Sequence, residues 1–391
     1  MICVGIDVSK DKHDCCIFSS DGQLLLKPFS VPNNRDGFDS LYSAIRSFEN
    51  DPDKVKVGLE ATGHYSFNIL GYLLEKGIHC FVFNPLHTNL YRKSLTLRKT
   101  KTDKVDSKII AKMLLSEVDL KPYSKTLYHN EQLKSLSRYR FSKIRERGNL
   151  KQQLARLVNI LFPELENLVP SLHLSSVYAL LEEFPGASYV AKAHITRLSN
   201  LLCASSKGHY KKDKAVEIRN AASSSVGSVM PAKSLELKHT IQLIRILSEE
   251  IDEIESQIQE IMEKIQSPIT SIPGLGFRMA AMILSEIGDF SKFDSPDKIL
   301  AFAGISPSTY QSGKLDNAYA HMEKRGSRYL RYALYNAAIY VCHWDKTFSV
   351  YLQKKRAEGK HYYVALSHAI KKLVRVIYRL QLTGEPYRPA V

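Results

Sequence analysis

The first 125 residues alternate between strand-like and helix-like segments, and this alternation limits the possible folds more than any other feature of the chain. Three β-rich runs come first, separated by short turns such as Asp21-Gly22, as in an antiparallel meander. The segments that follow are predicted alternately as helix and strand. The three runs are residues 2–8, 13–20 and 24–31, and the later segments are 36–49 (helix), 55–60 (strand), 65–76 (helix) and 78–84 (strand). This order predicts an α/β domain with a mixed sheet.

The boundaries of these segments follow from particular residues. The helix over 36–49 is predicted to bury one apolar face, formed by Phe38, Leu41, Ile45 and Phe48. Gly77 ends the next helix, and Pro85 closes the strand over 78–84.

A long helix is predicted over 131–162, with an apolar stripe and a strongly basic polar face. The stripe consists of Leu133, Leu136, Ile144, Leu150, Leu154, Leu157 and Leu161. Between residues 134 and 156 the helix carries eight Lys or Arg and one acidic residue, Glu146. Its polar face is therefore expected to be cationic.

A second long helix is predicted from about Ala232 to Ile265, after Pro231. Its apolar positions follow coiled-coil spacing and are residues 237, 241, 244, 247, 251, 254, 258, 261 and 265. Two interpretations stay open: an antiparallel partner for helix 131–162 within the chain, or a coiled coil between subunits. The segment before it, 203–231, is rich in Ser, Ala, Lys and Gly and is predicted to be a loop-rich connection, within an insert of about 163–231.

The charge balance points to a polyanionic partner. Lys and Arg number 55 and Asp and Glu 40, which gives a net charge of +15, and such a surplus favours nucleic acid over a membrane. No apolar stretch approaches the roughly 20 residues of a membrane span. Asp7 interrupts the apolar run that a signal peptide needs. The six cysteines form no CxxC pair and are predicted to be small core residues in a reducing compartment, which indicates a soluble, cytoplasmic protein.

Four carboxylates are candidates for one metal site. Asp7 ends the first strand, and Glu60 ends the strand over 55–60. Asp103 and Asp106 lie one helical turn apart, within a segment (92–112) that holds eight basic side chains. Four carboxylates in one place need compensating cations. Their hard oxygen ligands suit Mg²⁺, with Mn²⁺ as an alternative, and two ions about 3.5–4 Å apart can hold both sides of a phosphodiester displacement.

The sequence blocks that carry these acids resemble a known family. The segments GIDVSK, GLEATGHY and RKTKTDKVDSKIIA are similar, in order and spacing, to the DEDD tetrad in the RuvC-like domain of the IS110 family of bacterial insertion-sequence transposases, which has the Piv-like DNA invertases as relatives. The resemblance implies a ribonuclease-H-like fold, in agreement with the meander and the alternation above. It also implies that Asp7, Glu60, Asp103 and Asp106 are the catalytic metal ligands.

The C-terminal part begins with the turn of SIPGLGFRMAAM, which is interpreted either as a helix-hairpin-helix-like element or as an ordinary capped helix start. Further on, Ser312 precedes Gly313 in a polar loop, and a basic helix starts near Ser327. On spacing alone a Ser-Gly pair indicates a turn.

The segments AGISPSTYQSG and KRGSRYLRYALYNAA, however, resemble the C-terminal transposase domain of the same family, with Ser327 at a position where an Asn is expected. In that domain the serine equivalent to Ser312 is the nucleophile. Ser312 is therefore implied to attack a DNA phosphate and to form a transient phosphoserine.

The resemblance implies a site-specific recombinase of an insertion sequence. Its expected partners are target and donor DNA, a structured element-encoded guide RNA, and further copies of the chain in a dimer or tetramer with a composite active site. Phosphate contacts are expected from basic residues in three segments: Arg98, Lys99, Lys101, Lys104, Lys143, Arg147, Lys324, Arg325, Arg328 and Arg331. The expected domains are a RuvC-like domain (1–127), a helical region (128–265) and a mostly helical transposase domain (266–391).

Three other functions are weighed against this one. A RuvC-like structure-selective nuclease would use metal-activated water, and Ser312 would then be structural. An actin-like sugar kinase would need a second Gly-rich phosphate loop, which the sequence lacks. A non-catalytic RNA-binding protein would show no Mg²⁺-dependent DNA cleavage.

Overall fold

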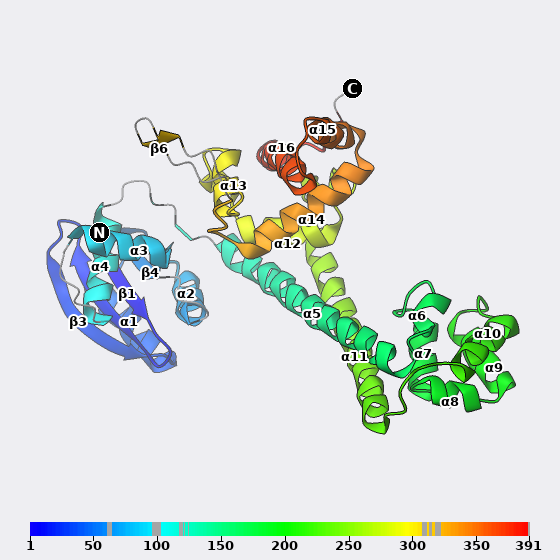
Figure 1. Cartoon of the computed structure of the whole chain (residues 1–391). Helices are drawn as coiled ribbons and strands as arrows, with labels where there is room; N and C mark the ends of the chain where they lie inside the picture. The colour runs from blue at the N-terminus through cyan, green and yellow to red at the C-terminus, as the bar shows by residue number, and fades with distance from the viewer. Residues whose placement is uncertain are drawn as a thin grey trace. The chain divides into compact units, whose positions relative to one another are not determined.

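The computed structural model describes residues 1–60, 65–95, 103–116, 120, 122–123, 125–306, 311–312, 315–316 and 322–389. The chain forms two compact units (Figure 1): Met1–Gln132 with Gly288–Asp294, and Leu133–Ile287 with Ser295–Val391. The domain boundaries derived from the sequence stay predictions. Within the described residues, no helix is both long enough and apolar enough to cross a bilayer.

The first unit is built on a five-stranded mixed sheet in the order β3-β2-β1-β4-β5. The strands are β1 (Ile2–Val8), β2 (Lys12–Ser19), β3 (Leu24–Pro32), β4 (Val55–Glu60) and β5 (His79–Phe83). The first three form the predicted antiparallel meander, and β4 and β5 are parallel to β1. This confirms the ribonuclease-H-like, RuvC-like mixed sheet that the sequence predicts. Because β1 is central, both of its faces are buried.

Helices cover both faces of this sheet. Helices α1 (Arg35–Arg46) and α2 (Ser66–Glu75) share a hydrophobic core with Val4 and Ile6 of β1. Helix α4 (Asp103–Ser116) packs on the opposite face, in a cluster that includes Cys3, and Tyr91 of α3 (Pro85–Leu95) packs against the same cluster. Residues of β1 therefore alternate between the α1–α2 face and the α4 face, as the two-residue period of a strand requires.

Two details of this unit differ from the sequence-based predictions. Helix α1 ends at Arg46 rather than at 49, so Phe48 lies beyond the helix and is 42% exposed instead of joining its buried face. Pro85 ends the strand as predicted but also opens α3, a helix that the sequence analysis did not predict. Proline is favoured at the first position of a helix because its missing N–H has no partner there anyway.

Helix α4 approaches the sheet closely because two strand residues facing it are glycines. A Cβ atom on Gly5 would lie 2.1 Å from the carbonyl oxygen of Ser107, and one on Gly58 would lie 2.8 Å from Cγ2 of Ile110. At Gly5 a side chain would meet the backbone of the helix, and at Gly58 it would meet side chains of the helix and of Phe83. These two glycines fix the distance between α4 and strands β1 and β4.

The second unit contains two long helices that pair within the chain. They are α5 (Lys125–Leu161), of which residues 133–161 belong to this unit, and α11 (Pro231–Ile265). Their polar contacts run in opposite directions along the two helices: Arg140 with Glu255, Lys143 with Glu250, and Gln153 with Glu236. The antiparallel pairing within the chain, one of the two predicted interpretations, is therefore present. Near the end of α11, Met262 is buried in place of the predicted positions 261 and 265.

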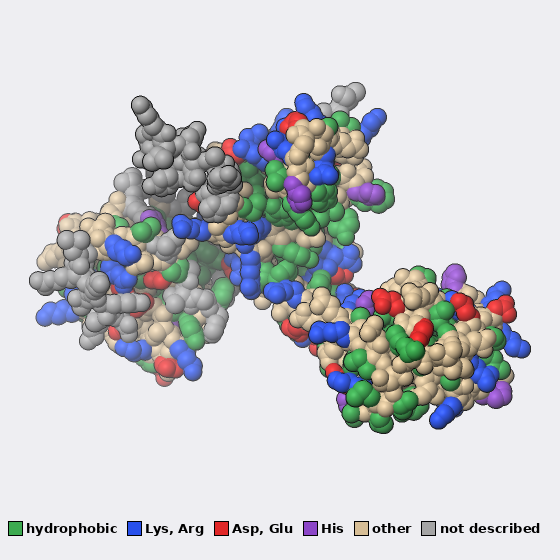
Figure 2. Space-filling view, viewed as in Figure 1, with side chains coloured by type: hydrophobic (Ala, Val, Ile, Leu, Met, Phe, Trp, Pro, Cys, Tyr) green, Lys and Arg blue, Asp and Glu red, His purple; other side chains and the backbone are tan. Residues whose placement is uncertain are grey.

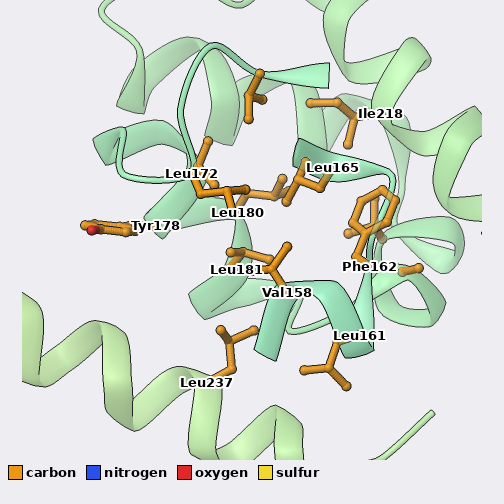
Figure 3. Close-up of a cluster of buried hydrophobic side chains, with 14 of the residues drawn as sticks. Val158, Leu161, Phe162, Leu165, Leu172, Tyr178, Leu180, Leu181, Ile218 and Leu237 are labelled. Carbon is orange, nitrogen blue, oxygen red and sulfur yellow. The ribbon is translucent and has the colours of Figure 1, made fainter. Parts of the chain in front are cut away.

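The chain segment that connects α5 to α11 forms a helical module with its own core. It comprises α6 (Leu165–Leu168), α7 (Ser175–Glu183), α8 (Ala187–Lys192), α9 (Ile195–Ser205) and α10 (Lys212–Ser223). Figure 3 shows Phe162, Leu180 and Ile218 converging in this core. The prediction of a loop-rich insert over about 163–231 is thus wrong for α6 to α9, and that of a loop-rich connection over 203–231 is wrong for α10. Ala215, Ile218 and Ala222 are buried at helical spacing there, but small Ala and Ser residues give such a helix the composition of a loop.

The rest of the second unit is mostly helical, as predicted. Its elements are α12 (Phe277–Ile287), α13 (Pro296–Phe302), β6 (Gln311–Ser312), β7 (Leu315–Asp316), α14 (Arg328–Trp344), α15 (Lys346–Ala357) and α16 (Tyr362–Thr383). Hydrophobic side chains gather on its surface (green in Figure 2), and Tyr340 and Trp344 line a groove of about 480 Å³.

Gly274, in the turn before α12, has φ +84°, and a Cβ there would lie 2.6 Å from the carbonyl oxygen of Tyr340. This glycine is needed for packing within the unit.

The six cysteines are free thiols, and five of them are buried, as expected of small core residues. Cys203 is the exception, because it lies on the exposed side of α9. Burial raises the pKa of the Cys16 thiol, which faces α4, to about 11.

The close approach of α4 leads to a stability prediction. Gly5→Ala should destabilise the first unit by about 3 kcal/mol or more, because the added methyl group meets backbone atoms of α4 that cannot move independently. Hydrogen exchange at the amides of β1 and β4 measures this loss. As a control, Gly148→Ala in α5 places its methyl group in open space and should stabilise that helix by up to about 1 kcal/mol. Unchanged exchange in Gly5→Ala would show that α4 does not depend on this contact.

Candidate active site

Two of the predicted acids end neighbouring parallel strands. The register of β1 and β4 pairs Gly5 with Gly58 and Ile6 with Leu59, so Asp7 and Glu60 are the next residues along the two strands. Since side chains alternate between the faces of a sheet, Asp7 lies on the face of Gly5, and Glu60 on the face of Gly58. Both acids are therefore on the side of the sheet that α4 covers, and both are partly buried.

Helix α4 brings Asp106 to the same edge of the sheet. Ile110 of α4 packs over Gly58, and Asp106 lies one helical turn before Ile110. Asp106 is only 7% exposed. Glu60 and Asp106 line one cavity of about 250 Å³. Asp103 begins α4 one turn before Asp106, but its side chain lies outside the described residues. The structure thus joins two acids in one cavity and places Asp7 on the adjacent strand end.

Helix α3 supplies the rest of this cavity, including a cation that the sequence analysis missed. Its residues Pro85, Thr88, Asn89 and Arg92 line the cavity. Arg92 donates from Nη1 to Oδ1 of Asp106 at 3.2 Å and from Nη2 to Oδ1 of Asn89 at 2.7 Å. A helix start at Pro85 followed by polar residues at helical spacing was the available signal. It went unused because Pro85 was interpreted only as a strand end.

Asp14 is a further acid at this edge that the sequence analysis did not identify. It lies directly opposite Asp7 in the antiparallel pair of β1 and β2, and it is 1% exposed. Its carboxylate accepts a hydrogen bond from the Ser30 hydroxyl at 2.6 Å and pairs with Lys12 Nζ at 3.1 Å. A charged residue at a buried strand position was the signal for it. Because like charges opposite each other repel, the pairing of Asp14 with Lys12 lowers the cost of placing it beside Asp7.

The donors in the cavity fit a hard divalent cation by their chemistry. Across the described ranges, no group of three or more His, Cys, Asp or Glu side chains stands ready to hold a metal ion. The cavity does hold carboxylate oxygens from Glu60 and Asp106, the donor type that Mg²⁺ and Mn²⁺ prefer. Asp106 is also already matched by a positive charge, that of Arg92, as a buried carboxylate requires. Glu60 and Asp106, with Asp7 and Asp103 nearby in the fold, are the residues that would hold such an ion.

The two predicted nucleic-acid contacts on α5, Lys143 and Arg147, both bind side chains of α11. Lys143 pairs with Glu250 at 2.8 Å, and this hydrogen bond raises the pKa of Lys143. Arg147 donates to the hydroxyl of Ser248 at 3.1 Å. Nearby, Arg140 pairs with Glu255 at 2.6 Å. The cationic face of α5 therefore serves in part to hold α11.

The basic residues around the start of α14 are more accessible. Lys324, Arg325 and Arg328 are exposed. Arg331 instead donates from Nη1 to the carbonyl oxygens of Ala303, at 2.9 Å, and Lys324, at 3.3 Å, so it ties two backbone segments together. Of these four predicted phosphate contacts, the three exposed side chains are therefore the accessible ones.

Ser327 caps α14. Its hydroxyl accepts a hydrogen bond from the N–H of Leu330 at 3.1 Å and donates to Oε2 of Glu286 at 2.6 Å. Glu286 is 4% exposed and accepts two more hydrogen bonds from Arg138, at 2.6 and 3.0 Å. Serine here does the capping work that the expected asparagine would also do.

The remaining predicted residues are placed only in part. Ser312 lies in β6 rather than in a loop and pairs with Leu315 of β7, but its side chain is outside the described residues. Lys104 lies in the first turn of α4, and its side chain is likewise not described. Arg98, Lys99 and Lys101 fall outside the described residues altogether.

Comparisons with known proteins identify matches at both ends of the chain. A family model described as "Transposase", named for the DEDD transposases of IS110, matches residues 4–163. A second, "Transposase IS116/IS110/IS902 family", matches residues 266–353. The chain is 24% identical to the "Insertion element IS116 uncharacterized 44.8 kDa protein" of Streptomyces clavuligerus over 100% of this chain and 96% of that protein. It is 22% identical to the "Pilin gene-inverting protein" of Moraxella bovis over 98% of this chain and 97% of that protein.

Among solved structures, T. thermophilus RuvC in complex with a Holliday junction substrate is similar, with 14% identity and a TM-score of 0.22, over 32% of this chain and 99% of RuvC. The fold assignment above rests on the strand order of the sheet.

The cap of α14 can be tested by substitution. Ser327→Ala should cost the second unit about 1–2 kcal/mol, because it removes the capping oxygen and one donor to buried Glu286. Urea unfolding followed by the fluorescence of Trp344, the one tryptophan in the chain, reports on this helix. Ser327→Asn keeps a capping side chain and should lose less than half as much stability. Equal losses in the two variants would argue against the capping role.

Proposed function

We propose, from the premise that this chain belongs to the IS116/IS110/IS902 family of transposases, that it is a metal-dependent recombinase that cuts and rejoins DNA strands through a phosphoserine intermediate on Ser312. The observation that carries the proposal is the cavity shared by Glu60 and Asp106, with Asp7 on the adjacent strand end. The remaining steps follow from the chemistry of these residues.

The carboxylates of Asp7, Glu60, Asp103 and Asp106 would hold Mg²⁺, or Mn²⁺, as two ions. A bound divalent cation would neutralise these acids and polarise the scissile phosphate. The close packing of α4 on the sheet supports this assignment, because it keeps Asp106 beside the ends of β1 and β4. Glu60 and Asp106 thereby line one cavity, although they lie 46 residues apart along the chain.

Ser312 would act as the nucleophile. Its Oγ forms a bond to phosphorus while one phosphorus–oxygen bond of the DNA strand breaks, the serine proton passes to solvent or a nearby base, and the leaving oxygen keeps the bonding electrons. Exposed Lys324, Arg325 and Arg328 would neutralise phosphate charge in this region. Attack by a DNA hydroxyl on the phosphoserine then restores the serine and joins the new strand.

The proposed partners are target and donor DNA, a structured guide RNA encoded by the element, and other copies of the chain in a dimer or tetramer with a composite site, acting in the cytoplasm. The net charge of +15 supports a polyanionic partner. Of the two basic surfaces, the start of α14 is the more available, because Lys143 and Arg147 on α5 already bind side chains of α11.

A structure-selective DNA nuclease is the second candidate. It is favoured by one observation: the described carboxylate cavity is lined entirely by residues of the first unit, from β4, α3 and α4. In that case a water molecule would attack the phosphate, and Ser312 would have no chemical role.

Ser312→Ala separates the two functions. We expect it to abolish strand exchange and the covalent protein–DNA product, with a loss of roughly a thousandfold or more, because the attacking oxygen is gone. The covalent product is measured as a protein band that retains labelled DNA after denaturation, and Ser223→Ala on α10 is the matched control. If cleavage persists in Ser312→Ala, the nuclease function is correct instead.

Asp106→Asn tests the metal-binding carboxylate. We expect strand transfer to fall by roughly a thousandfold, while DNA and RNA binding without divalent ions stay within about twofold, because the substitution keeps the shape of the side chain and removes its charge. Gel-shift and strand-transfer assays measure the two quantities, with Asp36→Asn on α1, on the opposite face of the sheet, as the control. A parallel loss of binding would make Asp106 a structural residue.

A further inference from the structure

We propose that Arg92 is the resident counter-cation of the carboxylate cavity, that a divalent metal ion displaces it from Asp106, and that metal loading thereby releases its guanidinium to bind a substrate phosphate. The proposal rests on the proposed function for the identity of the metal site. It adds a positioning residue from α3, outside the four acids.

The first support is the burial of the ion pair. The side chain of Asp106 is 9% exposed and that of Arg92 is 24% exposed, with Nη1 and Oδ1 3.2 Å apart. A carboxylate this deeply buried needs a cation or several hydrogen-bond donors to stay ionised. Arg92 supplies that charge in the structure, and it does so from inside the cavity lined by Glu60. The ion pair therefore lies in the wall of the cavity, because both of its residues line it.

The second support is the way Arg92 is held. Asn89, one helical turn earlier on α3, accepts a hydrogen bond from Nη2 at 2.7 Å, while Nη1 reaches Asp106. A guanidinium released from Asp106 would therefore remain tethered to α3 at the cavity. Its planar fork of donors matches the oxygens of a phosphate, which a compact ammonium group does not.

Electrostatics makes the two cations compete. A divalent ion on Asp106 would repel a guanidinium held at hydrogen-bond distance from the same carboxylate, and it brings twice the positive charge. In the metal-free protein, Arg92 therefore keeps the acids from repelling one another. In the loaded protein, the same side chain is pushed from its acid toward a new anion, so metal binding and phosphate binding support each other.

The exchange is tested by titrating Mn²⁺ alone into the full-length protein and following the heat of binding. Arg92→Met removes the charge but keeps a long stem, and it should bind Mn²⁺ roughly tenfold more tightly than the natural protein, because no resident cation has to leave. Arg92→Lys keeps the charge and should stay within about threefold of the natural affinity. The control is Lys112→Met, an exposed cation on α4 itself, which should change the affinity by less than twofold.

Phosphate capture is tested by measuring the affinity for a short DNA duplex, with and without Ca²⁺, which takes the same oxygen ligands. Ca²⁺ should strengthen DNA binding by the natural protein several times more than it strengthens binding by Arg92→Met. Equal strengthening in the two proteins would contradict the release of the guanidinium toward phosphate.

The outcomes of the Mn²⁺ titration separate this inference from the proposed function. The exchange is overturned if Arg92→Met binds Mn²⁺ no more tightly than the natural protein does. It is also overturned if Lys112→Met gains as much affinity as Arg92→Met. Neither result contradicts the proposed metal site. An absence of Mn²⁺ binding in all four proteins overturns the proposed metal site and the exchange with it. If Arg92→Met fails to fold, Arg92→Lys decides: affinity within threefold of the natural protein supports competition by charge, and a large gain contradicts it.

Discussion

The grouping of the acids at the ends of β1 and β4 depends on the close packing of α4 against these two strands. Gly5 and Gly58 make it possible, since a Cβ atom at either position would collide with the helix. Asp7 and Glu60 lie two residues after these glycines, on the same face of the sheet. Asp106 lies one helical turn before Ile110, the residue of α4 that packs over Gly58. The glycines therefore determine how near the acids lie to one another. A helix held farther from the sheet would leave the same acids on separate surfaces, with nothing to share a cation.

Several buried or partly buried carboxylates in the two units are matched by a cation. Asp106 pairs with Arg92 and Asp14 with Lys12 in the first unit. In the second unit, Arg138 binds Glu286, and Glu255 lies between Arg140 and Arg278. Burial raises the pKa of Glu255, but the hydrogen bonds from these two arginines outweigh it and hold the pKa below its ordinary value. Part of the basic charge on α5 is thus structural, whereas Lys324, Arg325 and Arg328 near the start of α14 stay exposed.

The predictions from sequence succeeded where a local pattern is enough. The meander, the strands that carry Asp7 and Glu60, and the two long helices follow from periodicity and from turn residues, and the structure contains them all. They failed where composition imitates another state. Helix α10 has the Ser and Ala content of a loop, and α3 begins at Pro85, a residue type that also marks the end of a strand. Asp14 and Arg92 carry only weak local signals, and the contacts that bring them to the acids join separate elements, β2 with β1 and α3 with α4.

The sequence by itself determined which elements form, which acids end the strands, and that the chain carries the motifs of a transposase family at both ends. Hydrophobic periodicity and turn-forming residues are local features of a few residues, so they can be recognised in the sequence without a structure. Only the tertiary structure decided that the long helices pair within the chain, that the cations of α5 bind acids of α11, and that a guanidinium lies between α3 and Asp106. Those outcomes depend on which surfaces, distant in sequence, come into contact. A buried charged side chain then pairs with an opposite charge that this packing places next to it.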